Sequence, residues 1–389
     1  MASDEFKPIF VVGMFRSATT LITKALNVHS KINVVADPFF QFFKEYRNEV
    51  FHSQGYDDFD DGYPISDNFF SEFSDVNNYF RSATLNVPFK HVSLEKIKES
   101  LFPFCEFYCP ELAPLLSKIE ANDYDELFRA LLKLGRKVYG GSKVEFVGCK
   151  NTFCEQFVAP LINTYPNIKV IQLIRDPRSV LASQNKAVGC SYPILFALRH
   201  WRKSAAYALE NMDKTDNFLL VQYEKFINDP SGEMKRICTF LGVDYEEGMV
   251  DPSRYVSKEG GQWKQNSSFG TSTKITNKFS EKWKEILNKK EIQFVEDLCE
   301  IEMLLFNYER ITPNGIHTSV ISPPKFDLDI QEWIKKYGED FETNSKEMNK
   351  EMERYLLLKD SSEKVNPVHL ENVFIVKDFL SRIQNFSLD

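Results

Sequence analysis

The sequence predicts an α/β fold, in which short buried strands alternate with helices. Residues 9–26 begin as a β-branched apolar run, pass through a polar loop and resume with apolar side chains at helical spacing. Residues 170–174 form a second buried run, and Asp176-Pro177 shortly after it is a typical helix start. Residues 218–226 indicate a third strand that leads into a turn. Strands that are each followed by a turn or a helix are typical of the α/β class.

The loop after the first predicted strand is rich in hydroxyls and carries one arginine. It consists of Arg16, Ser17, Ala18, Thr19 and Thr20. A strand, such a loop and a helix N-terminus form an anion site, because backbone N–H groups converge there and the helix dipole favours negative charge. In the nucleotide loop G-x-x-x-x-G-K-[ST], counted from Gly13, Ala18 would replace the second glycine and Thr19 the lysine. Without that lysine we expect no cradle for the β- and γ-phosphates of a nucleoside triphosphate, and a plain loop with chance hydroxyls is the alternative.

A second polar pattern follows the strand at residues 170–174. Arg175 lies where that strand ends and the next helix begins, and Ser183 lies two turns into the helix on a compatible side. An arginine and a hydroxyl placed in this way can both bind one phosphate. The two patterns together therefore predict a site with two anion-binding parts, about 160 residues apart in the chain.

These two patterns resemble those of sulfotransferases that use 3′-phosphoadenylyl sulfate (PAPS), notably the tyrosylprotein and carbohydrate branch. The first resembles the R/K-S-G-T-T-L loop that holds the 5′-phosphosulfate, with Ala18 at the usual glycine. The second resembles R-D-P-R-x-V-x-x-S, which binds the 3′-phosphate, and Arg175 and Ser183 meet its spacing. The resemblance covers about residues 6–310. It implies a P-loop-like three-layer fold, a central parallel sheet flanked by helices, with PAPS across the carboxyl ends of the strands.

The resemblance also assigns roles to single residues. Arg16 would neutralise charge on the bridging oxygen as PAPS becomes its product, adenosine 3′,5′-bisphosphate (PAP), and no metal is implied. Asp37 matches the acidic catalytic base of the family, whereas its alternative role is to cap a helix that starts at Pro38. Lys150 stands in the place of the lysine at the end of a family strand. The further residues expected at the cofactor are Ser17, Ala18, Thr19, Thr20, Tyr223, Ser267 and Lys282.

The chain of 389 residues is long enough for one large domain or two. We expect a sulfotransferase domain at residues 6–310 whose last helix spans residues 285–308. From residue 311 the chain is proline-rich and then charged, and residues 368–386 have the apolar spacing of an amphipathic helix. We therefore expect a helical C-terminal extension at residues 311–389 that packs back on the core.

Composition limits the class of protein further. A net charge of −8 argues against a general nucleic-acid binder. The first residues have neither a basic region nor an apolar segment, and the chain has no apolar run of about 18 residues, so we expect neither a leader peptide nor a membrane span. Seven cysteines with scattered spacing favour a reducing compartment over a disulfide framework or a zinc site. A cytoplasmic protein is the expectation, and the sequence does not indicate its oligomeric state.

The acceptor is predicted from the stretch that follows Asp37. No Lys or Arg occurs between Arg47 and Arg81, where acidic and aromatic residues alternate. Such a surface suits a small neutral or cationic acceptor, for example an amine- or guanidine-bearing natural product, better than a polyanion. A solvated acidic loop with inward-facing aromatic rings is the alternative for the stretch itself. For the whole chain, the alternatives are a carbohydrate sulfotransferase, a non-catalytic PAPS-binding relative and a P-loop kinase.

Overall fold

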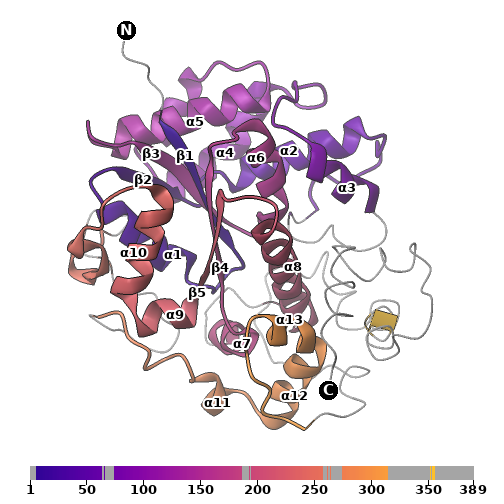
Figure 1. The fold of residues 1–389 in the computed structure, drawn as a ribbon. Coiled ribbons are helices and arrows are strands. Elements are labelled where there is room, and N and C mark those ends of the chain that lie inside the picture. Colours follow the sequence, from indigo (N-terminus) through magenta and orange to yellow (C-terminus); the bar gives the residue numbers. More distant parts are fainter. Residues whose placement is uncertain are drawn as a thin grey trace.

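The computed structural model describes residues 6–63, 65, 74–185, 192, 194–256, 261, 263, 274–313, 351 and 353–354. Within them, five strands form one parallel sheet in the order β2-β3-β1-β4-β5 (Figure 1). The strands are β1 (Lys7–Gly13), β2 (Ile32–Ala36), β3 (Phe146–Thr152), β4 (Lys169–Ile174) and β5 (Phe218–Gln222). All four strand pairs are parallel.

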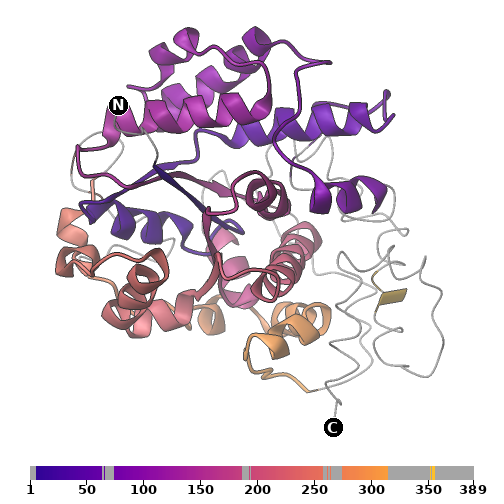
Figure 2. The same ribbon diagram turned by 45° about the horizontal axis from the view of Figure 1, so that its top comes forward.

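Helices cover both faces of this sheet, so the expected α/β fold with a central parallel sheet is confirmed (Figures 1 and 2). One face packs against α1 (Thr19–Val28), α9 (Tyr223–Asn228) and α10 (Pro230–Leu241). The helices that pack against the other face or lie above it are α2 (Phe40–Ser53), α3 (Ser74–Ser82), α4 (Leu94–Tyr108), α5 (Tyr124–Tyr139), α6 (Val158–Thr164) and α8 (Ile194–Met212). The remaining helices are α7 (Pro177–Asn185), α11 (Trp283–Ile286), α12 (Lys289–Leu298) and α13 (Glu300–Leu305).

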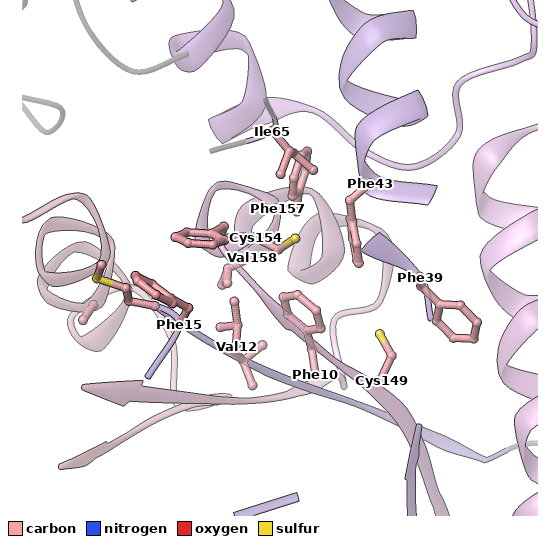
Figure 3. Packing of buried hydrophobic residues seen from close by; sticks show 14 of the residues in the cluster. Phe10, Val12, Phe15, Phe39, Phe43, Ile65, Cys149, Cys154, Phe157 and Val158 are labelled. Carbon is pink, nitrogen blue, oxygen red and sulfur yellow. The ribbon is translucent and has the colours of Figure 1, made fainter. Parts of the chain in front are cut away.

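Strand β1 shows why the sequence builds two cores. Its side chains alternate between the faces, so Phe10 and Val12 enter one core while Ile9 and Val11 enter the other. The core that holds Phe10 is rich in aromatic rings. Phe10 lies 5.4 Å from Phe43 of α2, measured between ring centroids (Figure 3). Many of the 34 phenylalanines in the sequence are therefore core residues.

The predicted last helix differs from the structure, where three helices occupy its residues. Asn288 accepts hydrogen bonds from the N–H groups of Lys290 (2.9 Å) and Glu291 (3.1 Å), and the Glu291 carboxylate accepts the N–H of Asn288 (2.7 Å). This capping box starts α12 as a new helix after α11. A further break at Cys299 separates α12 from α13.

The predicted extension at residues 311–389 falls mostly outside the described residues, and so does the amphipathic helix at 368–386. Described residues of it that contact the core include Glu351 and Arg354. Glu351 pairs with Arg199 (3.2 Å) and Arg202 (2.6 Å) of α8, and Arg354 pairs with Glu302 of α13. The boundary at residue 310 stays a prediction.

The described part of the acidic stretch lies toward the C-terminal end of α2. Glu49 is buried and accepts a hydrogen bond from His91 (2.7 Å), and Asp61 pairs with His52 (2.8 Å). Phe51 is buried, with its ring centroid 4.2 Å from that of Phe59. Here the aromatic rings face inward, as the alternative interpretation expects. Because a helix of this length spans about 20 Å, these carboxylates lie well away from the end of α2 that follows Asp37.

Candidate active site

The candidate site lies along the carboxyl ends of the five strands. At this edge β1 has β3 on one side and β4 on the other, which makes it the switch point of the sheet, where open α/β sheets bind ligands. Chemically competent side chains lie at or just beyond every strand end. They are Asp37 after β2, Lys150 near the end of β3, Arg16 after β1, Arg175 after β4 and Tyr223 after β5.

The loop after β1 has the backbone shape of an anion-binding nest. Gly13 is in a left-handed conformation (φ 153°), and a Cβ there would lie 2.5 Å from the carbonyl oxygen of Leu173, so only glycine fits. Arg16 (φ 63°) and Ala18 (φ 69°) are left-handed as well. Such alternation turns successive N–H groups toward one side. Ala18 is the N-cap of α1, so the N–H groups of the first helical turn also face this loop.

The two predicted motifs meet in one cluster. Arg16 donates from Nε to Oγ of Ser183 (2.9 Å), and Arg175 donates from a terminal nitrogen to the carbonyl oxygen of Arg16 (3.0 Å). The guanidinium of Arg175 stacks over the ring of Tyr223 at 4.3 Å. Trp201 of α8 donates from its indole nitrogen to the carbonyl oxygen of Arg175 (2.7 Å). No sequence pattern indicates Trp201, because its contact depends on how α8 packs.

Two polar groups in this cluster suit an anion. The hydroxyl of Ser17 and the Nε of Arg175 are buried, and neither has a hydrogen-bond partner among the described residues. Buried polar groups are normally satisfied, so two orphans beside a helix N-terminus fit an anionic ligand such as the phosphates of PAPS. The two threonines of the motif are the first residues of α1 in the structure, where Thr19 is buried and Thr20 is exposed.

Asp37 forms an ion pair with Lys150, whose Nζ donates to Oδ2 of the carboxylate. The register of the sheet places Lys150 beside Ala36, and the N–H of Asp37 donates to the Lys150 carbonyl (2.7 Å). The Lys150 side chain is 2% exposed and that of Asp37 is 22% exposed. The carboxylate is therefore the solvent-facing member of the pair.

The alternative role of Asp37 as a helix cap is wrong. Asp37 is left-handed (φ 59°), and α2 begins three residues later, at Phe40. The carboxamide oxygen of Asn151 instead accepts the N–H of Phe40 (2.9 Å). The side chain of Asp37 is thereby left for Lys150 and the open edge of the sheet.

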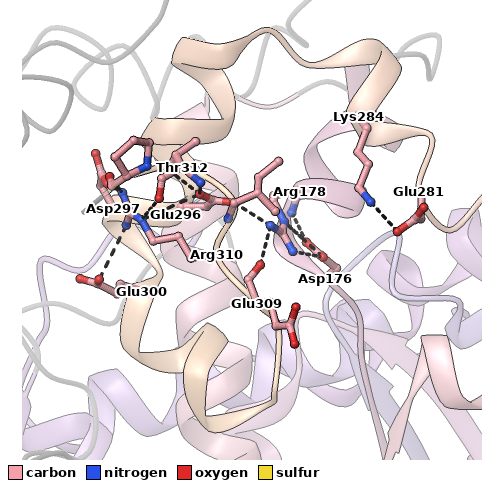
Figure 4. Close-up of polar contacts among 12 residues, drawn as sticks. Asp176, Arg178, Glu281, Lys284, Glu296, Asp297, Glu300, Glu309, Arg310 and Thr312 are labelled. Carbon is pink, nitrogen blue, oxygen red and sulfur yellow. Dashed lines mark hydrogen bonds and ion pairs between the residues drawn. The ribbon is translucent and has the colours of Figure 1, made fainter. Parts of the chain in front are cut away.

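An ionic network holds the start of α7, the helix that carries Ser183 (Figure 4). Arg178 donates to Asp176 (2.7 Å) and to Glu296 of α12 (2.6 Å), and its guanidinium stacks over Trp283 of α11 at 4.1 Å. Glu296 also accepts the backbone N–H groups of residues 311 (3.1 Å) and 312 (2.9 Å). The second arginine of the R-D-P-R pattern thus ties α7 to α11 and α12.

The carboxylate of Glu224, in the first turn of α9, supports the same helix start. It accepts the N–H of Asp176 (3.0 Å) and the hydroxyl of Tyr308 (3.0 Å). Burial, reinforced by the charge of Asp176, raises the pKa of Glu224 above its ordinary value. The position of Arg175, which lies between β4 and Asp176, therefore depends on the contact with α9 as well.

Two predicted cofactor residues are not brought into the cluster by any described contact. Lys282 directly precedes α11 and pairs with Glu285 (2.6 Å). Its segment does approach α7, since the hydroxyl of Ser179 donates to the carbonyl of Ser280 (2.9 Å). Ser267 lies outside the described residues.

Other features of the described residues concern metals, thiols and membranes. No group of three or more potential metal ligands occurs among them. Their six cysteines are free thiols. Among the helices that the structure describes, none has the length and apolar character that crossing a membrane requires.

The profile described as "Sulfotransferase family" matches residues 8–247. Carbohydrate sulfotransferase 3 of Tetronarce californica is 26% identical over 180 residues, which are 40% of this chain and 40% of that protein. Carbohydrate sulfotransferase 1 of Danio rerio is 26% identical over 158 residues, 34% of this chain and 36% of that protein. The chain thus spans less than half the length of these curated relatives.

Solved structures with a similar arrangement include the sulfotransferase domain of the olefin synthase from Synechococcus PCC 7002. It is 16% identical, with a TM-score of 0.48, and the match covers 79% of this chain and 98% of that one. Retinol dehydratase, solved with androsterone and the inactive cofactor PAP, is 14% identical with a TM-score of 0.34, over 76% of this chain and 80% of that one.

A parallel sheet with a nest-shaped loop and an arginine–serine cluster at its carboxyl edge defines an α/β protein whose site suits a phosphorylated ligand. The family match covers more than half of the chain, and the chain belongs to the sulfotransferase family.

Proposed function

We propose that this chain is a sulfotransferase that transfers the sulfuryl group of PAPS to a hydroxyl or an amine of a small-molecule acceptor. The observation that carries this proposal is the convergence of Arg16, Ser183 and Arg175 at the carboxyl edge of the sheet. These three side chains come from two motifs that are distant in the sequence. Their N–H and O–H groups can donate hydrogen bonds to one anionic molecule. In this reaction the acceptor oxygen or nitrogen bonds to sulfur and loses its proton, while PAP leaves with the electrons of the broken bond between sulfur and its bridging oxygen.

The donor half of the site would bind PAPS and stabilise developing charge. Arg175 and Ser183 would hold the 3′-phosphate, with Tyr223 near the adenine. The loop N–H groups, with Ser17, Ala18, Thr19 and Thr20, would hold the 5′-phosphate. Arg16 would neutralise charge on the bridging oxygen, an effect that a preorganised cation supplies without reorganisation. Ser267 and Lys282 would close over the nucleotide.

The acceptor half would use the pair of Asp37 and Lys150. Asp37 is the more exposed partner, so its carboxylate would take the acceptor proton. Lys150 would fix the orientation of that carboxylate, because its own side chain is buried and already directed at Asp37. Asp37 is one methylene shorter than the glutamate usual in the family, and its left-handed backbone places it directly at the strand end.

Calorimetry with PAP and with 5′-AMP, which lacks the 3′-phosphate, tests the donor half. We expect PAP to bind at least about tenfold more tightly, the effect of one or two charge-assisted hydrogen bonds. Equal affinities would contradict the proposal. Mass spectrometry of an acceptor panel incubated with PAPS then tests transfer itself and distinguishes a small-molecule acceptor from the carbohydrate acceptors that the relatives' names suggest.

A further inference from the structure

The half of the sheet edge that does not hold the nucleotide cluster is lined with aromatic residues. β2, β3 and β1 are adjacent strands, and each is followed within four residues by a phenylalanine. These are Phe40 after β2, Phe153 after β3 and Phe15 after β1. β4 and β5 are followed instead by Arg175 and Tyr223, the residues of the nucleotide half. The edge is thus divided by chemistry, with β1 shared between the two parts.

Three rings on the β1 and β3 side contact one another. The ring centroid of Phe15 lies 5.4 Å from that of Phe153 and 4.6 Å from that of Tyr192, and Phe153 lies 5.9 Å from Tyr192. Phe15 directly precedes Arg16, and Phe153 follows Lys150 by three residues. Tyr192 is half-buried and forms the rim of this group.

Phe153 is held in a costly conformation. It is left-handed (φ 62°), which a bulky side chain rarely adopts. Its N–H donates to the carbonyl of Gly13 (3.3 Å), and its own carbonyl accepts Nζ of Lys203 (3.3 Å). Strain that is maintained by its surroundings is typical of functional positions, and here it sets the ring beside Phe15.

A second pair of rings lies at the β2 end of the edge, whereas the first group belongs to β1 and β3. Phe40 begins α2, and Phe104 of α4 stacks on it with a centroid distance of 6.0 Å and an interplanar angle of 24°. Both side chains are half-buried. Phe104 therefore leaves much of its ring outside the core, at the strand end that carries the candidate base.

We propose that these two groups of rings form the acceptor site, and that the acceptor carries its hydroxyl on an aromatic or other apolar ring system. This inference rests on the proposed function, because it takes the Asp37–Lys150 pair as the point of transfer. Rings of both groups would hold a flat apolar body by stacking and exclusion of water. The acceptor oxygen would then lie between Asp37 and the loop of Arg16.

The charges around these rings disfavour a polyanionic glycan. Lys203 is buried and contacts the carbonyl of Phe153 and the carboxylate of Glu155 (3.9 Å). Lys150 is buried against Asp37. These two lysines are thus committed within the protein, whereas a sulfated or uronic acid polymer requires solvent-facing bases.

The test measures KM for 2-naphthol at saturating PAPS, together with the Kd for PAP by calorimetry. Phe104→Ala and Tyr192→Ala remove half-buried rings, so neither change empties the main core. We expect each to raise the KM for 2-naphthol about tenfold, the effect of losing one stacked ring, while the Kd for PAP is unchanged. Phe102→Ala is the matched control, because Phe102 lies on the same helix and is 42% exposed; it should change neither constant.

Two results would overturn the inference while leaving sulfuryl transfer from PAPS, the reaction in the proposed function, intact. One is sulfation of desulfated chondroitin, with PAP bound normally and no turnover of 2-naphthol. The other is a KM for 2-naphthol that is the same in Phe104→Ala, Tyr192→Ala and Phe102→Ala. Failure of the unmodified chain to bind PAP would instead refute the proposed function itself.

Discussion

Arg16 and Ser183 are 167 residues apart in the chain, yet Nε of the first lies 2.9 Å from Oγ of the second. Arg16 belongs to the loop after β1 and Ser183 to the helix after β4, and these two strands are neighbours in the sheet. The contact therefore depends on the pairing of β1 with β4. It makes the two anion-binding motifs parts of one site, so a change in either motif is expected to affect the binding of the same nucleotide.

Replacing Arg175 by alanine should weaken the binding of PAP by about 1.5–3 kcal/mol, because a charge-assisted hydrogen bond to the 3′-phosphate is lost. Calorimetry measures this directly, and the affinity for 5′-AMP should change much less. Arg254→Ala is the control, since Arg254 is an exposed arginine. An equal loss for PAP and 5′-AMP would mean that Arg175 does not bind the 3′-phosphate.

Asp37→Asn should reduce turnover by about 10²–10⁴-fold, because the amide cannot take the acceptor proton, while the Kd for PAP is maintained. The same change leaves the buried Lys150 without its carboxylate and should cost about 1–3 kcal/mol of stability. Adding Lys150→Met should restore stability in urea unfolding without restoring turnover. Recovery of turnover in the double variant would show that the lost activity was a folding effect.

Ala18→Gly should stabilise the protein. Ala18 is left-handed (φ 69°), a conformation that costs an L-residue about 1–2 kcal/mol and glycine almost nothing. Glycine also makes the unfolded chain more flexible, so the expected net gain is about 0.5–1 kcal/mol. Thermal unfolding checks the gain, and Ala18→Val, which places a β-branched residue at the same φ, should lower the midpoint. A lower midpoint for glycine would contradict the role of backbone strain here.

Because of the ionic network around Glu296, the free energy of unfolding should fall at acidic pH. Burial opposes ionisation of Glu296, but hydrogen bonds from Thr312, the backbone and Arg178 outweigh it, so the pKa lies below the ordinary 4.5. A carboxyl whose pKa is depressed by folding contributes stability above its unfolded pKa and loses that contribution as the pH falls through the folded value. Unfolding in urea should therefore become easier below about pH 4.5.

Glu296→Gln provides the matched comparison. At pH 7 it should cost about 3 kcal/mol, because Arg178 loses a buried charge partner. The difference from the unmodified protein should shrink as the pH falls from about 4.5 through the lower pKa of the folded carboxyl, because the native carboxylate is itself protonated below that folded pKa. If the difference in unfolding free energy between the two proteins stays constant from pH 7 to this acidic range, the charge of Glu296 does not contribute to stability.

The elements that local pattern determines could be predicted from the sequence. The apolar runs at β1 and β4 each precede a helix start, and both strand-to-helix connections were expected. The break before α12 was missed although its signal is local, since Asn288 and Glu291 have the spacing of a capping box. A pattern of apolar residues alone does not reveal such a break, because helices on both sides of it keep similar periodicity.

The site could be predicted only where its residues belong to a motif. Arg16, Arg175 and Ser183 were expected together and lie together. The ion pair of Asp37 with Lys150 depends on the register of β2 against β3, which no single-strand pattern contains. The position of the Phe153 ring could not be predicted from a single-strand pattern either, because its left-handed backbone is held by contacts with β1 and α8.

The order of strands in the sheet also has a consequence for how the protein is made. β1 and β2 do not pair with each other, and in the described sheet each has its ladder partners only among β3 and β4. During synthesis at about 5–20 residues per second, the first two strands would thus wait roughly 5–20 s for residue 146 to emerge. Two apolar strands without partners are a template for wrong pairing. A chain that stops before β3 should therefore aggregate or bind a chaperone, and folding of the sheet should be slow compared with that of its helices.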